Sequence, residues 1–190
     1  MREVRRSALL PFTAAQVYGL VADVERYPEF LPWRTTARIL SDEGEFVTVN
    51  LGLSRGMARG SFTTRNRLVP ERSLTMSLVD GPFSLLEGRW EFTPIADAGS
   101  RADLHVRFAT HGVVGGLVLG PAFQEICSQL VDAFGRRAHQ VSTNAHAQAA
   151  LDAFAGLVKR AGVLVQPRDM AASFSRELGL LRVIFVAVGA

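Results

Sequence analysis

The stretch PAFQEICSQLVDAFGRRAHQV, residues 121–141, repeats its apolar side chains at the spacing of an α-helix. The residues that share one stripe are Phe123, Ile126, Cys127, Leu130, Val131, Phe134, Ala138 and Val141. Glutamine, acidic and arginine side chains fall between them. This pattern predicts one long amphipathic helix whose apolar face must be covered by another part of the chain.

The residues expected to cover this apolar face lie upstream, where apolar side chains recur at every second residue instead of every 3.6 residues. Between residues 33 and 109, apolar side chains alternate with polar ones, as in strands with one buried and one wet face. The predicted inward residues include Phe62, Thr64, Asn66, Leu68, Leu74, Met76, Leu78, Leu86, Trp90, Phe92, Leu104, Val106 and Phe108. Short breaks such as SDEGE and VDGPF separate the strands, which favours an antiparallel meander.

A first strand at residues 2–10 brings the expected total to about seven. We therefore predict an α+β fold, in which a curved antiparallel sheet wraps around the long helix and buries both apolar faces. This domain is expected to span residues 1–141. Residues 142–190 are expected to form an extension of unknown role, with a break at 142–144, helices near 147–161 and 170–178, and a last strand at 180–190.

A second helix start lies near the N-terminus, in PFTAAQV. Thr13 is placed as the N-cap and Gln16 as the third helical residue, which together form a capping box. Phe12 and Val17 flank the cap as a hydrophobic staple, and the helix should end near Asp23.

The stretch RYPEFLPW, residues 26–33, follows this helix. Its two prolines disfavour helical geometry at the residues before them, so they bracket a single turn at residues 28–31. Tyr27, Phe30 and Trp33 are three apart and can share one side of that turn. We interpret the stretch as a semi-rigid rim at an open end of the sheet.

Composition limits the classes of function. Hydrophobic residues make up 48% of the chain, and no apolar run reaches the ~18 residues of a membrane span. The single Cys127 excludes an internal disulfide. No secretion signal is recognised, so a cytoplasmic protein is expected. The sequence pI of 9.7 rests almost wholly on arginine, but the arginines are scattered rather than clustered.

No set of catalytic residues emerges from the sequence. The histidines, His105, His111, His139 and His146, fall in no metal-ligand spacing. Cys127 lies on the apolar stripe, where a thiol behaves as a small hydrophobe. Asp80 and Glu87 flank the motif GPFSLL, but Glu87 alternates to the wet face, away from any shared substrate. We therefore expect no enzymatic activity, no metal and no cofactor.

Four motifs together resemble a known family: RSALLPFTAAQVYGLVADVERYPEFLPW, FTTRNRL, LVDGPFSLLEGRWEFTP and LGPAF. The chain resembles the coenzyme-Q-binding and ribosome-association toxin (RatA) branch of the START-like, polyketide cyclase/dehydrase superfamily over about residues 1–141. The resemblance implies a helix-grip fold with a cavity between sheet and helix. Its implied ligand is a polyprenyl quinone (coenzyme Q) or a related isoprenoid lipid, bound without catalysis in support of respiration.

The same resemblance leaves two other functions open. One is binding to the large ribosomal subunit, which blocks subunit joining. The other is an aromatase/cyclase activity, which the wider superfamily permits. A lipid ligand further implies transient contact with the inner face of the membrane. DNA is not an expected partner.

Residues are expected to line the cavity, to form its rim or to contact RNA. Those expected to line the cavity are Phe30, Trp33, Phe62, Thr64, Asn66, Leu74, Met76, Leu78, Trp90, Phe92, Phe108, Phe123, Ile126, Leu130 and Phe134. Those expected at its rim are Tyr27, Pro28, Pro32, Pro82 and Phe83, with residues 111–120 as a second mouth loop. Candidate polar groups are Thr64 and Asn66, together with Thr48 and Asn50 on the Phe46 face. The outward Arg65, Arg67, Arg89 and Arg107 would contact RNA in a ribosome-binding protein.

Overall fold

The computed structural model describes the backbone of residues 1–160 and, apart from residues 34, 97, 113–116, 150 and 154–160, their side chains. The chain divides into two units, Met1–His139 and Gln140–Ala190. The first carries the fold described below. The helix and strand expected at 170–178 and 180–190 lie outside the described residues.

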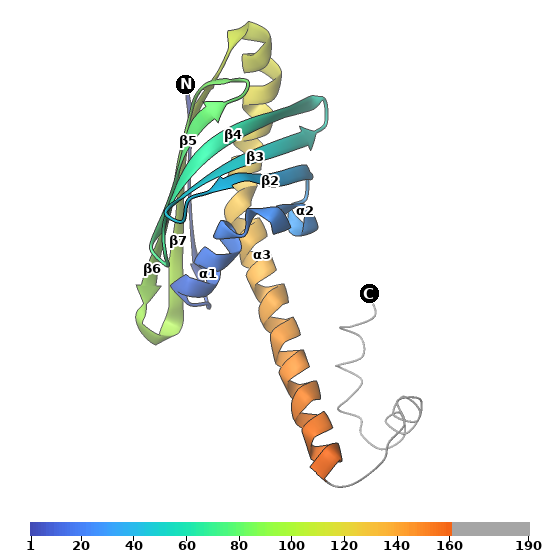
Figure 1. Cartoon of the computed structure of the whole chain (residues 1–190). Coiled ribbons are helices and arrows are strands. Elements are labelled where there is room, and N and C mark those ends of the chain that lie inside the picture. The colour runs from blue at the N-terminus through green and yellow to red at the C-terminus, as the bar shows by residue number, and fades with distance from the viewer. Residues whose placement is uncertain (161–190) are drawn as a thin grey trace. The chain divides into compact units, whose positions relative to one another are not determined.

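Seven antiparallel strands form one sheet in the order β1-β7-β6-β5-β4-β3-β2. The strands are β1 (Arg2–Leu10), β2 (Arg34–Asp42), β3 (Phe46–Arg55), β4 (Ala58–Val69), β5 (Ser73–Asp80), β6 (Phe83–Ile95) and β7 (Gly99–Thr110). The helices are α1 (Ala14–Ala22), α2 (Tyr27–Phe30) and α3 (Gly112–Arg160), with 3-10 turns at Val24–Arg26 and Ala96–Ala98. Figure 1 shows the sheet curving around the first half of α3, which confirms the predicted helix-grip fold.

The predicted start of α1 is confirmed in detail. The Gln16 backbone N–H donates to Thr13 Oγ1 at 3.2 Å, and the Thr13 N–H donates to Gln16 Oε1 at 2.9 Å. Both bonds satisfy amide groups that a helix start otherwise leaves unpaired. The helix ends at Ala22, and the 3-10 turn Val24–Arg26 leads to α2. The single turn predicted at residues 28–31 lies one residue earlier, at Tyr27–Phe30: Tyr27 is helical despite the following proline, whereas Leu31 before Pro32 is extended as expected.

The alternation of side chains on β4 to β7 is confirmed by burial. Phe62, Leu74, Trp90 and Phe108 are buried, while the charged residues between them are exposed or half-exposed. The turn between β5 and β6 requires glycine, because Gly81 has φ of 140° and an added Cβ would lie 2.6 Å from the Cβ of Phe62. The motif DGPF therefore lets the chain turn closely over the core.

Two sequence predictions about α3 are wrong. The helix begins at Gly112 rather than at Pro121, so residues 112–120 are helical and Pro121 lies inside the helix. Leu119 packs against the hydrophobic core, which favours the early start. Nor does the helix break at 142–144, since serine, threonine and asparagine each cost only a few tenths of a kcal/mol in a helix interior.

The assignment of the inner face of β3 is also wrong. Val47 and Val49 are buried, so the opposite side chains, Phe46, Thr48 and Asn50, point away from the core. A similar exception occurs on β4, where Thr63 was predicted to be wet and is buried. Thr63 faces Asn50 across the pairing of β3 with β4 and accepts a hydrogen bond from Asn50 Nδ2 at 3.0 Å, so it is buried on the outer side of the sheet and not in the core.

No helix among the described residues combines the length and the apolar character needed to cross a membrane.

Candidate functional site

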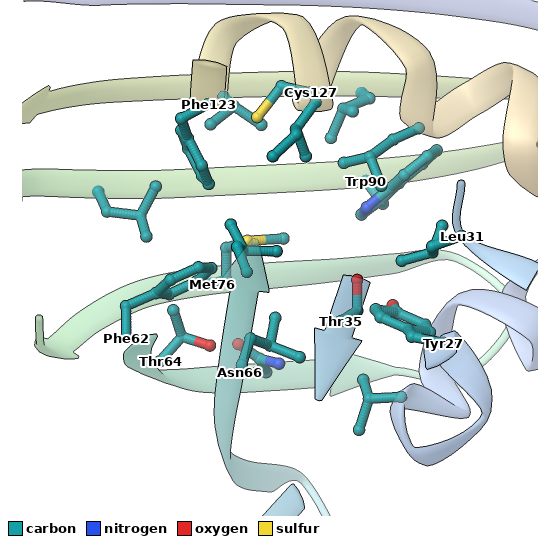
Figure 2. A pocket seen from close by; sticks show the side chains of 18 of the residues that line it. Tyr27, Leu31, Thr35, Phe62, Thr64, Asn66, Met76, Trp90, Phe123 and Cys127 are labelled. Carbon is teal, nitrogen blue, oxygen red and sulfur yellow. The ribbon is translucent and has the colours of Figure 1, made fainter. Parts of the chain in front are cut away.

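A small apolar cavity lies between the concave face of the sheet and α3. Its volume is about 80 Å³. Its walls are formed by Val24, Tyr27, Leu31, Trp33, Thr35, Leu51, Leu53, Phe62, Thr64, Asn66, Leu74, Met76, Leu86, Trp90, Leu104, Val106, Phe123, Ile126, Cys127, Leu130 and Phe134. Figure 2 shows Thr64 and Asn66 on the β4 wall, opposite Phe123 and Cys127 on α3.

Most residues that the sequence assigned to the cavity do line it. Four do not: Phe30, Leu78, Phe92 and Phe108. Phe108 instead packs in a cluster with Phe83 and Phe123, with ring centroids 6.1 and 4.8 Å away. The sequence could not separate the two groups, because the alternation of a strand defines a face but not a position along it.

The structure places the predicted rim residues in different environments. Tyr27 is buried and lines the cavity, and its hydroxyl donates to the Val21 carbonyl at 2.6 Å. Phe83 is buried in the core, Pro82 is half-buried, and Pro28 and Pro32 are exposed. Of residues 111–120, those whose side chains the structure describes are not among the residues that line the cavity. From Gly112 onwards this segment forms the first turns of α3 and not the expected loop, so a mouth at this place stays a prediction.

Two polar atoms in the cavity wall have no hydrogen-bond partner among the described residues. They are the carbonyl oxygen Oδ1 of Asn66 and the indole Nε1 of Trp33, and both are buried. Each unsatisfied group costs about 1–3 kcal/mol of stability. One is an acceptor and the other a donor, so both could be satisfied by a bound molecule with polar atoms.

Neither thiol nor phenol in the wall is suited to catalysis. Burial raises the pKa of the Cys127 thiol from 9.0 to about 12, so it remains protonated at neutral pH. Burial likewise raises the pKa of the Tyr27 phenol above its ordinary value of 10.0. Within the described residues, no three histidine, cysteine or acidic side chains form a group that could hold a metal ion. Glu87 is exposed and pairs with Arg107 instead of facing the cavity.

The outer face of the sheet carries arginines in ion pairs. The pairs are Arg65–Glu43, Arg67–Glu45, Arg89–Glu91 and Arg107–Glu87. The Arg65 guanidinium also lies over the Phe46 ring, 4.6 Å from its centroid. All four arginines predicted to contact RNA are therefore neutralised by a neighbouring carboxylate.

A second, open hollow of about 570 Å³ adjoins the tip of the β3–β4 hairpin. It is lined by Pro32, Trp33, Ser54, Arg55, Gly56, Arg59 and Gln129. Sequence reasoning missed it, because its residues come from three separate segments. A clue was available in the pair Arg55 and Arg59, which flank a glycine turn.

A family described as "Polyketide cyclase / dehydrase and lipid transport" matches residues 10–135, which hold all of the residues that line the cavity. The chain belongs to this family.

Relatives of this member of the polyketide cyclase/dehydrase and lipid transport family include a protein named for ribosome association and one named for coenzyme Q binding. "Ribosome association toxin RatA" of Vibrio cholerae is 42% identical over 141 residues, which cover 74% of this chain and 98% of that protein. "Coenzyme Q-binding protein COQ10 homolog B, mitochondrial" of Xenopus laevis is 25% identical over 143 residues, which cover 73% of this chain and 59% of that protein.

A solved structure shares the fold of this family member. It is a START superfamily protein from Mycobacterium smegmatis, 19% identical, with a TM-score of 0.63 over 73% of this chain and 98% of that one. At this identity the likeness concerns the fold alone.

Proposed function

We propose that the protein binds an isoprenoid lipid, such as a polyprenyl quinone, in the cavity between the sheet and α3, without transforming it. The observation that carries the proposal is an apolar cavity whose wall holds two unpartnered polar atoms, Asn66 Oδ1 and Trp33 Nε1. Ligand sites combine apolar walls with a few placed polar groups. The similarity to a protein described as coenzyme-Q-binding supports the same class of ligand.

Binding requires the cavity to expand. A volume of about 80 Å³ is well below the ~300–1,000 Å³ of typical ligand pockets. Met76 and Leu130 line the cavity, are only half-buried, and can move outward more readily than the fully packed residues. Methionine is especially adaptable, because its side chain is unbranched and flexible. The proposal therefore implies a slow opening step before a prenyl chain enters.

The test is chemical identification of the ligand. The full chain is purified from a quinone-producing bacterium, extracted with organic solvent and examined by mass spectrometry. The proposal expects an isoprenoid lipid in near-stoichiometric amount, and uptake of added decylubiquinone by protein that was stripped first. Protein that carries no isoprenoid lipid, and takes up none on mixing, would contradict it.

We further propose ribosome association as a second function, on a separate observation. Several relatives at 39–42% identity are described as ribosome association toxins. The arginines on the sheet are half-exposed, and exposed ion pairs are worth only about 0–1 kcal/mol, so a guanidinium could exchange its carboxylate for an RNA phosphate.

Sedimentation with large ribosomal subunits tests this second function. Binding through phosphates should be present at 50 mM salt and should weaken by orders of magnitude at 200 mM. A protein that fails to sediment with subunits at the lower salt concentration would rule the function out. In either role we place the protein in the cytoplasm, with membrane contact confined to lipid transfer.

A further inference from the structure

The basic hollow and the apolar cavity meet at Trp33. The indole lines both spaces, and it is 6% exposed. On β3, Leu53 lines the cavity and the next residue, Ser54, lines the hollow. On α3, Leu130 lines the cavity and the preceding Gln129 lines the hollow. The two spaces are therefore neighbours, and Trp33 belongs to the wall of both.

The charge of the hollow is positive. Arg55 and Arg59 line it, and none of its described lining residues is acidic. The Arg55 side chain is 34% exposed and donates to Gln129 Oε1 at 3.0 Å, while a Glu125 oxygen lies 3.8 Å from its guanidinium. That contact is longer than a hydrogen bond, so Arg55 retains donors for a further acceptor. Arg59 is exposed.

We propose that this hollow binds the acidic head group of the lipid, a phosphate or a carboxylate, while the prenyl chain passes Trp33 into the cavity. The inference rests on the proposed lipid-binding function and narrows its preferred ligand to isoprenoid lipids with an acidic head group, so a neutral quinone would occupy the cavity without using the hollow. Two guanidinium groups offer the planar, paired donors that match such anions. Trp33 lines both spaces, and its buried N–H has no partner among the described residues, so it is a further donor for an oxygen of the ligand.

The connection to the cavity favours an amphiphile over a nucleic acid. A phosphate backbone would need only the arginines, whereas the hollow shares its inner wall, Trp33, with an apolar space. A lipid with an anionic head group and a prenyl chain can place the anion in the hollow and the chain in the cavity at the same time. Burial of the prenyl chain adds apolar stabilisation to the complex, which neither free phosphate nor RNA can supply.

The experiment compares three probes by isothermal titration: farnesyl phosphate, farnesol and inorganic phosphate. We expect farnesyl phosphate to bind at least about tenfold more tightly than farnesol, which corresponds to one charge-assisted interaction. Inorganic phosphate should bind far more weakly than either. The variants Arg55→Gln and Arg59→Gln should each lose about tenfold in affinity for farnesyl phosphate while keeping their affinity for farnesol.

The control variant is Arg38→Gln, an exposed arginine of β2 that does not line the hollow, and it should leave all affinities unchanged. Equal binding of farnesol and farnesyl phosphate, with no effect of the two variants, would overturn the head-group site but leave lipid binding intact. Binding of inorganic phosphate as tight as that of farnesyl phosphate would overturn the role of the chain. Failure of both prenyl probes to bind would refute lipid binding itself.

Discussion

Replacing Asn66 by leucine should make the protein more stable and less able to bind its ligand. The Asn66 amide carbonyl is buried in the cavity wall without a hydrogen-bond donor. Leucine has a similar size and no polar atom, so the change removes a desolvation penalty of about 1–3 kcal/mol. Imperfect packing of the leucine side chain offsets up to about 1 kcal/mol of this stabilisation. We expect a net increase of about 1–2 kcal/mol in the free energy of unfolding.

The chain offers a matched control in Asn50. Its Nδ2 donates to Thr63 Oγ1 at 3.0 Å and to the Phe62 carbonyl at 3.4 Å, on the outer side of the same pair of strands. Both substitutions replace asparagine by leucine in a strand, so both gain the same β-propensity. Asn50→Leu also loses these hydrogen bonds, which should lower the free energy of unfolding by about 1 kcal/mol. The two substitutions should therefore change stability in opposite directions.

Thermal unfolding followed by circular dichroism measures both effects. For a chain of this size, each kcal/mol shifts the midpoint by about 2–4 °C. Asn66→Leu should melt a few degrees above the parent protein and Asn50→Leu a few degrees below it. If Asn66→Leu lowers the midpoint as much as Asn50→Leu does, the Asn66 carbonyl has a partner in the folded protein, and the polar function assigned to it in the cavity is wrong.

Trp33, Cys127 and Tyr27, which all line the cavity, each allow a further test. Trp33→Ala should cost about 3–5 kcal/mol of stability and should speed lipid release in a stopped-flow transfer assay. Trp33→Phe, which keeps a ring and loses the unpartnered N–H, should cost much less. If Trp33→Ala loses stability but releases lipid at the rate of the parent protein, Trp33 is an ordinary core residue. Cys127 should resist a thiol reagent at pH 8 until the protein unfolds, and rapid labelling of folded protein would contradict its burial. Burial raises the pKa of the Cys127 thiol from 9.0 to about 12. The contribution of this thiol to stability is therefore complete below pH 9 and declines as the pH rises towards 12. A series of melting curves at increasing pH would detect this decline. Tyr27→Phe loses the bond to Val21 and should lower stability by about 1 kcal/mol, and a neutral result would mean that the bond does not contribute.

Local signals in the sequence predicted the fold well. The Thr13–Gln16 capping box, the turn at RYPEFLPW and the alternation of β4 to β7 each depend on neighbours within a few residues. Such patterns are visible without knowledge of the rest of the chain. The errors occurred where tertiary packing overrides them. Leu119 packs on the core and extends α3 across a glycine-rich stretch that looks like a loop.

The site was only partly predictable. The face of a strand follows from its alternation, so Asn66 and Met76 were placed correctly in the cavity wall. Depth along the strand depends on sheet curvature, which is why Phe92 and Phe108 were assigned to the cavity and do not line it. The basic hollow depends on the meeting of a hairpin tip, a turn and a helix, and no local pattern encodes that meeting.

A prenyl chain in the space between the sheet and α3 can be located by cross-linking. The probe is a farnesyl compound that carries a photoactivatable diazirine at its tail, and the labelled residues are mapped by peptide mass spectrometry. Labels are expected on cavity residues such as Leu53, Met76 and Ile126, and they should be lost when decylubiquinone competes. Labels confined to exposed apolar residues such as Val79 and Leu117 would contradict this location of the chain.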